Sequence, residues 1–386
     1  MSKRVGIITY WESNDNYGQQ LQCWALQYYL RKQGFHPFLI RFKRWRPKLS
    51  LKKRIKKIIK GGFASFLYKS GLINYGDLKY KTEGWTDKEI FRRQFPSFRK
   101  KFLNYTCRIY DNLNQLQRHP PRANVYITGS DQVWNYDLRE DELRAYFLQF
   151  GSKTTKRVAY APSIGHESIS LAYSNTYKLY LRHLDAISVR EVSSVKSINS
   201  LGFNAIAVLD PTMLLEDLDF NRIIKGVSAK PSVFIYSINY SSSGDLPFEQ
   251  IREYAREKEL PIVVTPGSGY LQAKELFDGV IYLYASIPQW LAQIANADLV
   301  VTPSFHGVVI SILFHRSFIY TPLKGKFSSS NSRVLDLLEA LNLENRIIKD
   351  YSSHCLLKNE INWADVDNRL SSLRQSSFFY LHNALM

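Results

Sequence analysis

The fold is decided by the stretch RVGIITYWESNDNYGQQLQCWALQYYLRKQGFHPFLIRF, residues 4–42. Its first part, Arg4–Tyr10, is short, apolar and rich in β-branched residues, which is typical of a buried parallel strand. Apolar side chains then recur at helical spacing over Gln20–Gln33, and Gly34 follows as a helix C-cap. Phe35–Phe42 returns to a strand pattern. The stretch is therefore a βαβ unit, and the loop after its first strand lies where open α/β sheets bind ligands.

The same alternation of strands and helices continues along the chain, and Glu216–Pro231 is predicted to connect two halves. The fold class predicted is α/β, with two Rossmann-like, doubly wound domains facing a cleft. Their predicted bounds are residues 1–215 and 230–360, and a C-terminal helix follows within 361–386. The remaining predicted strands are Val125–Thr128, Arg157–Ala161, Ala186–Arg190, Ile206–Leu209, Val233–Ile238, Ile262–Thr265, Val280–Leu283, Leu299–Thr302 and Phe318–Tyr320.

Composition and cysteine usage indicate a reducing compartment. The chain has 386 residues, of which 45% are hydrophobic, enough apolar material for two cores. Its three cysteines, Cys23, Cys107 and Cys355, are far apart and form no CxxC, which argues against a disulfide framework or a zinc site. We find no signal-peptide pattern before the first strand and no apolar run of about 18 residues. The sequence therefore predicts a cytoplasmic protein.

The charge is distributed unevenly. The formal net charge is +18, and the stretch between Asn16 and Gly76 contains fourteen Lys and Arg residues but no Asp or Glu. A local excess of one sign indicates an anionic partner surface.

A basic amphipathic insertion is predicted near residues 43–76. Apolar residues recur there at helical spacing, with lysines between them. Such a helix is typical of a membrane interface, but the apolar stripe could equally pack on the protein while the lysines meet water. A nucleic-acid partner is not predicted, because the stripe would serve no purpose there and no recognised motif accompanies it. The apolar positions are Leu51, Ile55, Ile58, Ile59, Phe63, Phe66 and Leu67.

Two motifs are candidates for the acceptor side of a site. Asn16-Tyr17-Gly18 begins the first helix, where the glycine would leave backbone N–H groups open to a ligand, although an ordinary turn has the same sequence. Residues 128–135, TGSDQVWN, follow a strand and combine Asp131 and Gln132 with the aromatic Trp134. That mixture suits the hydroxyls and the C–H face of a sugar, but Asp or Ser could instead cap the next helix.

Two further motifs are candidates for anion binding and proton transfer. Residues 188–191, SVRE, end a strand at Arg190, which could bind a carboxylate or phosphate or could pair with Glu191 at the surface. In residues 302–307, TPSFHG, His306 falls at a strand-to-helix turn, where helix N–H groups attract anions. A histidine there can pass a proton near neutral pH, although a lone loop histidine is more often structural.

Six segments carry a family resemblance. They are NYGQQLQCWALQYYL (16–30), TGSDQVWN (128–135), SVRE (188–191), LGFNAIAVLDPTMLL (201–215), TPSFHGVVISILFHRSFI (302–319) and NSRVLDLLEALNL (331–343). In this order they resemble the polysaccharide pyruvyl transferase family from about Val5 to Leu343, with the basic insertion and the tail outside the resemblance. The resemblance implies a GT-B-like pair of Rossmann domains. It also implies phosphoenolpyruvate as donor and ketal pyruvylation of a capsule, exopolysaccharide or other surface glycan.

The resemblance also implies roles for individual residues. The family histidine falls on His306, as general acid or phosphate partner, and the anion-binding arginine on Arg190. Many members have arginine two places before the histidine, where this chain has Ser304, and we predict Arg333 as its replacement. Asp131 is predicted to be the base or a ligand of the acceptor. The predicted donor-side set is Arg190, Ser304, Gly307 and Arg333, and the predicted acceptor-side set is Asn16, Gly18, Gln132 and Trp134.

The expected partners are phosphoenolpyruvate as co-substrate and a sugar acceptor, with no metal, no further cofactor and no nucleic acid. The basic insertion would bring the protein to a lipid-linked acceptor, and so predicts peripheral contact with the inner face of the cell membrane. One rival hypothesis is a GT-B glycosyltransferase that uses a nucleotide sugar. A second is a non-catalytic protein that binds membranes or polyanions, which would leave the motifs around Arg190 and His306 without a purpose.

Overall fold

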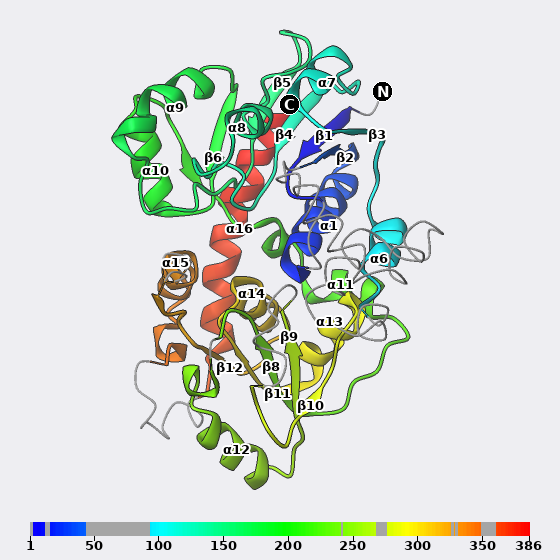
Figure 1. Ribbon diagram of the computed structural model, residues 1–386, viewed down its shortest axis with the longest axis vertical. Helices are drawn as coiled ribbons and strands as arrows, with labels where there is room; N and C mark the ends of the chain where they lie inside the picture. The colour runs from blue at the N-terminus through cyan, green and yellow to red at the C-terminus, as the bar shows by residue number, and fades with distance from the viewer. Residues whose placement is uncertain are drawn as a thin grey trace, which may run out of the picture.

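The structure is a computed structural model (Figure 1). It describes residues 3–11, 16–43, 93–240, 242–267, 276–325, 328, 331–348 and 360–386. Apart from Lys43, the predicted basic insertion lies outside the described residues.

The first domain is built on a seven-stranded parallel sheet with strand order β3-β2-β1-β4-β5-β6-β7. The strands are β1 (Arg4–Ile8), β2 (His36–Phe42), β3 (Tyr105–Tyr110), β4 (Val125–Thr128), β5 (Lys156–Ala159), β6 (Ala186–Val189) and β7 (Ile206–Ala207). Its helices are α1 (Tyr17–Lys32), α6 (Phe95–Phe102), α7 (Leu113–Arg118), α8 (Glu140–Tyr146), α9 (Ser174–Leu181), α10 (Val192–Asn199) and α11 (Asp217–Ile224). A 3₁₀ turn, η2 (Pro211–Leu214), follows β7.

The centre of this sheet forms because apolar residues fill both of its faces. Every residue of β4 is buried, and β1 is buried from Val5 onward. The two strands pair in parallel, with Val5 opposite Val125 and Ile7 opposite Ile127. Strand order reverses between β1 and β4, which is the switch point where doubly wound sheets bind ligands.

The second domain is built on a five-stranded parallel sheet with strand order β10-β9-β8-β11-β12. Its strands are β8 (Ser232–Ser237), β9 (Ile262–Pro266), β10 (Ile281–Tyr282), β11 (Ala297–Thr302) and β12 (Phe318–Tyr320). Its helices are α12 (Phe248–Glu257), α13 (Ile287–Asn296), α14 (Phe305–Leu313) and α15 (Ser332–Ala340). Both sheets have the doubly wound order, so the predicted two-domain, Rossmann-like α/β fold is confirmed.

The two domains share one apolar core. Tyr17 of α1 stacks on Trp290 of α13, with ring centroids 5.1 Å apart, and its hydroxyl donates to the Ala285 carbonyl at 2.6 Å. The buried Arg93 donates from Nη1 to the Tyr17 hydroxyl at 2.9 Å and from Nη2 to the Pro266 carbonyl at 2.7 Å. Apolar and polar contacts therefore hold the halves together beside the start of α1.

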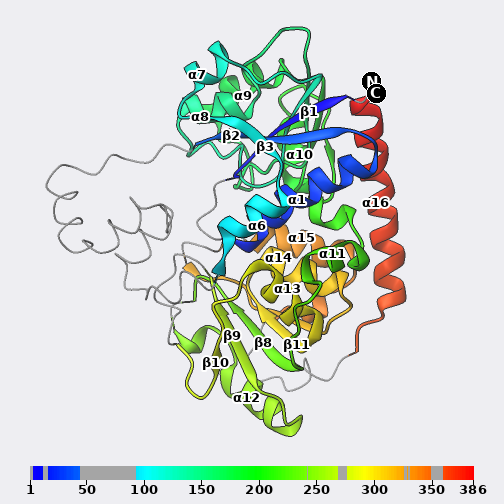
Figure 2. The same cartoon turned by 90° about the vertical axis from the view of Figure 1, so that its right-hand side faces the viewer.

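The last helix, α16 (Trp363–Leu385), runs along both domains and returns to the first, where the two termini lie side by side (Figures 1 and 2). Tyr380 donates to the Ala159 carbonyl of β5 at 2.7 Å, and Lys3 donates to the Leu385 carbonyl at 2.8 Å. α16 thus ties the second domain back to the first sheet. Of the helices described, none combines the length and apolar character that crossing a membrane requires.

Candidate active site

The carboxyl edges of the two sheets meet where α1 and α14 begin. α1 starts after β1, α14 starts after β11, and their first turns are in contact. A Cβ added at Gly18 would overlap the imidazole ring of His306. Two residues predicted from separate motifs therefore lie together across the domain boundary. The approach is possible because residue 18 has no side chain.

The turn that presents His306 is fixed by hydrogen bonds within the β11–α14 segment. Thr302 Oγ1 donates to the Tyr236 carbonyl and accepts from the Ser304 amide, both at 3.1 Å. Ser304 Oγ accepts from the Gly307 amide at 3.3 Å, which makes Ser304 the N-cap of α14. A side chain at Gly307 would crowd Thr302, because an added Cβ would lie 2.7 Å from Thr302 Cγ2. Ser304 and Gly307 therefore shape the turn, and their predicted contact with a donor stays a proposal.

A buried carboxylate, Asp210, connects the two domains at this point. It follows β7 and has no exposed side-chain surface. Its Oδ2 accepts from Ser130 Oγ at 2.8 Å and lies 3.4 Å from Arg190 Nη1. Its Oδ1 accepts from Thr212 Oγ1 at 2.7 Å and lies 3.6 Å from His306 Nε2. Arg190 of the first domain and His306 of the second therefore flank the same carboxylate.

Electrostatics keep Asp210 ionised. Burial raises the pKa of a carboxyl group, but His306, Arg190 and Thr212 outweigh that effect and hold the pKa of Asp210 well below its usual range. An ionised Asp210 can orient both Arg190 and His306 throughout a reaction near neutral pH.

The hydrogen bonds of Arg190 are made within its own domain. Its Nε donates to Glu191 Oε1 at 2.9 Å and its Nη1 to Ser130 Oγ at 3.4 Å, while its Nη2 has no hydrogen-bond partner among the described residues. Burial lowers the pKa of Arg190, but Glu191, Asp210 and Asp131 outweigh it and raise the pKa. One guanidinium nitrogen thus remains for a ligand.

Arg333 approaches Arg190 from the second domain. Its Cζ lies 5.8 Å from the centre of the Phe305 ring, and that of Arg190 lies 5.0 Å from the same centre. Burial and the charge of Arg190 lower the pKa of Arg333, whose Nε has no hydrogen-bond partner among the described residues. Two guanidinium groups therefore converge on one aromatic ring beside His306.

The first turn of α15 is fixed in a way that places Arg333. Asn331 Oδ1 accepts from the Tyr320 hydroxyl at 2.8 Å and from the Leu323 amide at 2.9 Å. These bonds anchor the start of the helix to the end of β12, so Arg333 is held on a rigid element.

Asp131 lies at the same edge of the first sheet. Its backbone has a φ of +83°, a region that a non-glycine residue adopts only under constraint, and its Oδ1 accepts from the Gln132 amide at 2.8 Å. It interacts electrostatically with both Arg190 and Arg333. The predicted base is therefore near the predicted anion site.

Asn16 is the N-cap of α1, with Oδ1 accepting from the Gln19 amide at 3.1 Å. It lies two residues from Gly18, at the helix start that touches His306. Capping of α1 therefore accounts for an asparagine at residue 16, and its predicted contact with an acceptor stays a proposal.

The prediction that Trp134 faces an acceptor is wrong. Its side chain is fully buried, its ring stacks on Phe147 with centroids 4.4 Å apart, and its Nε1 donates to the Tyr146 carbonyl at 3.4 Å. No face of the ring is open to a sugar. A nearby stack is more accessible: Tyr136 stacks with His166 and with Tyr173, at centroid distances of 4.0 Å and 4.8 Å.

The sequence motifs did not single out Asp210, Ser130 or Phe305 as site residues. Asp210 lies in the quoted segment 201–215, directly after the predicted strand Ile206–Leu209. Like Arg190, Asp210 lies at the end of a predicted strand, and this position was the signal in the sequence that could have identified it as a site residue. Among the residues that the structure describes, no group of three or more His, Cys, Asp or Glu side chains could hold a metal ion.

Known structures similar to this one are remote in sequence. An α-glucosyltransferase in complex with UDP and DNA has 8% identity and a TM-score of 0.47, with 98% of this chain and 91% of that chain covered. A UDP-N-acetylglucosamine 2-epimerase from Rickettsia bellii has 10% identity and a TM-score of 0.44, with coverage of 100% and 99%. A glycosyltransferase from Streptomyces nogalater has 13% identity and a TM-score of 0.44, with coverage of 100% and 98%. Similarity this low transfers no activity.

No curated protein matches the chain significantly. The family model described as polysaccharide pyruvyl transferase matches residues 16–322, a range that includes Gly18, Asp131, Arg190, Asp210 and His306. This range is well over half of the chain, and the chain therefore belongs to the polysaccharide pyruvyl transferase family.

Proposed function

We propose that this protein transfers a pyruvyl group from phosphoenolpyruvate to two hydroxyls of a glycan, forming a ketal. The observation that carries the proposal is the convergence of Arg190 and Arg333 on Phe305, next to His306. Phosphoenolpyruvate has a carboxylate and a phosphate on one carbon, and guanidinium groups bind both kinds of anion through paired hydrogen bonds. The unpartnered nitrogens of the two arginines supply such donors.

In the proposed reaction His306 donates a proton to the CH₂ carbon of phosphoenolpyruvate, which leaves an oxocarbenium centre at C2. A sugar hydroxyl then adds to C2. Asp131 accepts the proton of that hydroxyl and passes it to His306, which is thereby protonated again. The C2–O bond to phosphate then breaks, and the second hydroxyl adds to C2 and closes the ketal. Its proton leaves with the inorganic phosphate. One phosphoenolpyruvate and two hydroxyls thus give one ketal and one phosphate.

In this scheme Asp210 is a positioning residue. It holds Arg190 from one domain and faces the imidazole of His306 from the other, so it fixes the distance between the anion site and the proton donor. Preorganised charges of this kind stabilise the transition state without having to reorient during the reaction.

The acceptor is proposed to bind on the side of the first domain, at Gln132 and Asn16. The stacked rings of Tyr136, His166 and Tyr173 take the role first given to Trp134, because Tyr173 is 37% exposed and Trp134 is buried. Aromatic faces of this kind suit the C–H face of a sugar ring.

The glycan is proposed to be a capsular, exopolysaccharide or other surface polymer, assembled on a lipid carrier at the inner face of the cell membrane. The support is the run of lysines and arginines near residues 43–76, where each cation near an anionic leaflet adds about 1 kcal/mol of binding.

Replacing His306 tests the proton donor. We expect His306→Gln to lower phosphate release from phosphoenolpyruvate about 100-fold or more, because general acid catalysis contributes about 10²–10⁴. The matched control is His315→Gln, since His315 is half exposed and pairs with Asp367 away from the site. Unchanged turnover in His306→Gln would remove His306 from the mechanism.

Replacing Arg333 tests the donor site. We expect Arg333→Gln to raise the KM for phosphoenolpyruvate about 10- to 100-fold, as loss of a charged hydrogen bond costs about 1.5–3 kcal/mol. Thermal-shift titration should show the same loss of affinity, while Arg369→Gln, in an exposed pair with Asp365, should not. Stabilisation of the unaltered protein by a nucleotide sugar but not by phosphoenolpyruvate would favour the glycosyltransferase alternative.

A methyl group at Gly18 tests the contact between the domains. We expect Gly18→Ala to reduce turnover about tenfold or more, because the new Cβ displaces the imidazole of His306 and small misplacements of catalytic groups are costly. Gly244→Ala is the matched control, since the nearest atom to an added Cβ there is 3.6 Å away. Equal rates for the two variants would mean that His306 does not need its present position.

Deleting residues 49–67 tests the membrane proposal. We expect the deletion to abolish co-sedimentation with vesicles that contain anionic lipid, because it removes six of the fourteen cations of the basic stretch. Phosphate release with a water-soluble acceptor is the control for folding. Co-sedimentation that survives the deletion would reject this role for the segment.

A further inference from the structure

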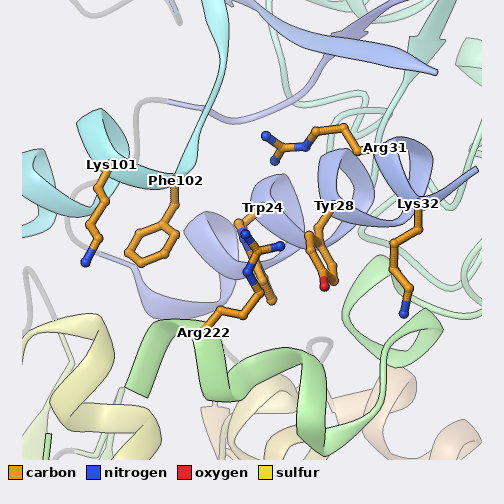
Figure 3. Close-up of a pocket in the computed structure, with 7 residues that line it drawn as sticks. All are labelled: Trp24, Tyr28, Arg31, Lys32, Lys101, Phe102 and Arg222. Carbon is orange, nitrogen blue, oxygen red and sulfur yellow. The ribbon is translucent and has the colours of Figure 1, made fainter. Parts of the chain in front are cut away.

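A pocket of about 350 Å³ lies between α1, α6 and α11 and shares no lining residue with the His306 site (Figure 3). Its aromatic floor consists of Trp24 and Tyr28, whose rings stack with centroids 5.2 Å apart, and Phe102 projects from α6 beside them. The proposed reaction uses none of these side chains.

The rim of the pocket is cationic, formed by Arg31, Lys32, Lys101 and Arg222. Lys32 is neutralised by Asp219, with Nζ 3.0 Å from Oδ1. Within the described part of the chain, no carboxylate forms an ion pair with the other three. Arg222 Cζ lies 5.1 Å from the centre of the Tyr28 ring, and Lys101 Nζ lies 5.1 Å from that of Phe102. The pocket therefore combines aromatic faces with unpaired positive charge.

Helix dipoles explain part of this arrangement. Each of the four cations lies in the last turn of its helix, α1, α6 or α11, where positive charge is favourable. That role does not require three helix ends to converge on one pocket. The convergence of these helix ends brings like charges together and destabilises the charged form of Arg31, since burial and the charge of Arg222 lower the pKa of Arg31. A bound anion would relieve this repulsion.

We infer that this pocket binds a carboxylated saccharide, namely a part of the polysaccharide that already carries a pyruvyl ketal. The inference rests on the proposed function, because a ketal formed from phosphoenolpyruvate retains its carboxylate and each transfer adds one negative charge to the glycan. The carboxylate pairs with Arg222 and Lys101, and the sugar ring lies against the aromatic floor.

The position of the pocket fits an extended polymer. Gly18, which touches His306, and Tyr28, in the pocket floor, are ten residues apart on α1, or about 15 Å at 1.5 Å per residue. An oligosaccharide of a few residues spans that distance. A modified repeat in the pocket would therefore keep the next repeat near the active site.

The shape of the pocket favours a saccharide over a membrane surface. Its volume is within the range of small-molecule sites, about 300–1,000 Å³. Trp24 is buried and Tyr28 is half-buried, while the four cations are exposed, whereas a helix that binds a bilayer presents its apolar residues outward.

Binding of two saccharides to the full-length protein tests the inference by calorimetry. The probes are a pyruvylated oligosaccharide and the same oligosaccharide after acid removal of its ketals. We expect the Lys101→Gln, Arg222→Gln double variant to bind the pyruvylated form at least about tenfold more weakly than the unaltered protein does, from the loss of two charged contacts. Arg118→Gln is the matched control, because Arg118 is also exposed in the last turn of a helix, α7. Equal affinity for the two oligosaccharides, or unchanged affinity in the double variant, overturns the inference.

Two parallel measurements separate this inference from the proposals it rests on. Phosphate release by the unaltered protein, with a short neutral acceptor, reports on the proposed function. If that reaction is absent but the double variant still binds the pyruvylated oligosaccharide more weakly than the unaltered protein does, the inference about the pocket is supported and the proposed activity is rejected. Co-sedimentation with anionic vesicles is the second measurement, and a loss of membrane binding in the double variant equal to that caused by deleting residues 49–67 would instead make the pocket a membrane contact and overturn the inference.

Discussion

The site depends on one buried carboxylate. Asp210 has no exposed side-chain surface, and a carboxylate in that position is stable only when charges and hydrogen-bond donors surround it. Ser130, Thr212 and Arg190 supply these from the first domain, and His306 adds the remaining neighbour from the second. Docking of the domains and assembly of the site are therefore a single event, because separating the halves would remove one neighbour of a buried charge.

Packing around α1 strengthens this constraint. Gly18 lets α14 approach until the imidazole of His306 meets the backbone, and Tyr17 next to it stacks on Trp290 of the other domain. Opening the domains at this point would uncover the Trp290 ring and break the bond from Tyr17 to Ala285. Both losses oppose opening, which favours a site of fixed geometry over one that is assembled by domain closure.

The sequence predicted the elements whose signals are local. The strands that became β1, β4 and β11 read as short apolar runs because they are covered on both faces, and His306 and Gly18 were found at helix starts. The edge strand β3 was missed because most of its residues are at least partly exposed. Trp134 was misjudged because polar neighbours surround it in sequence, whereas Phe147 covers it in space. Asp210 was missed because three of its four partners, Ser130, Arg190 and His306, come from distant segments, which no local pattern reveals.

In the proposed reaction, donor binding depends mainly on Arg333, because residue 304 is a serine and supplies no cation. Ser304 caps α14 and leaves no cation in that turn, while Arg190 is already compensated by Glu191 and Asp210. The three carboxylates Asp131, Glu191 and Asp210 also balance much of the positive charge around the site. A dianion would therefore be held less by net charge than by directed hydrogen bonds, and Arg333 is the guanidinium that no described carboxylate pairs with. Because Asn331 anchors the helix that carries Arg333, donor affinity in the proposed reaction would depend on the end of β12 as well as on the turn around His306.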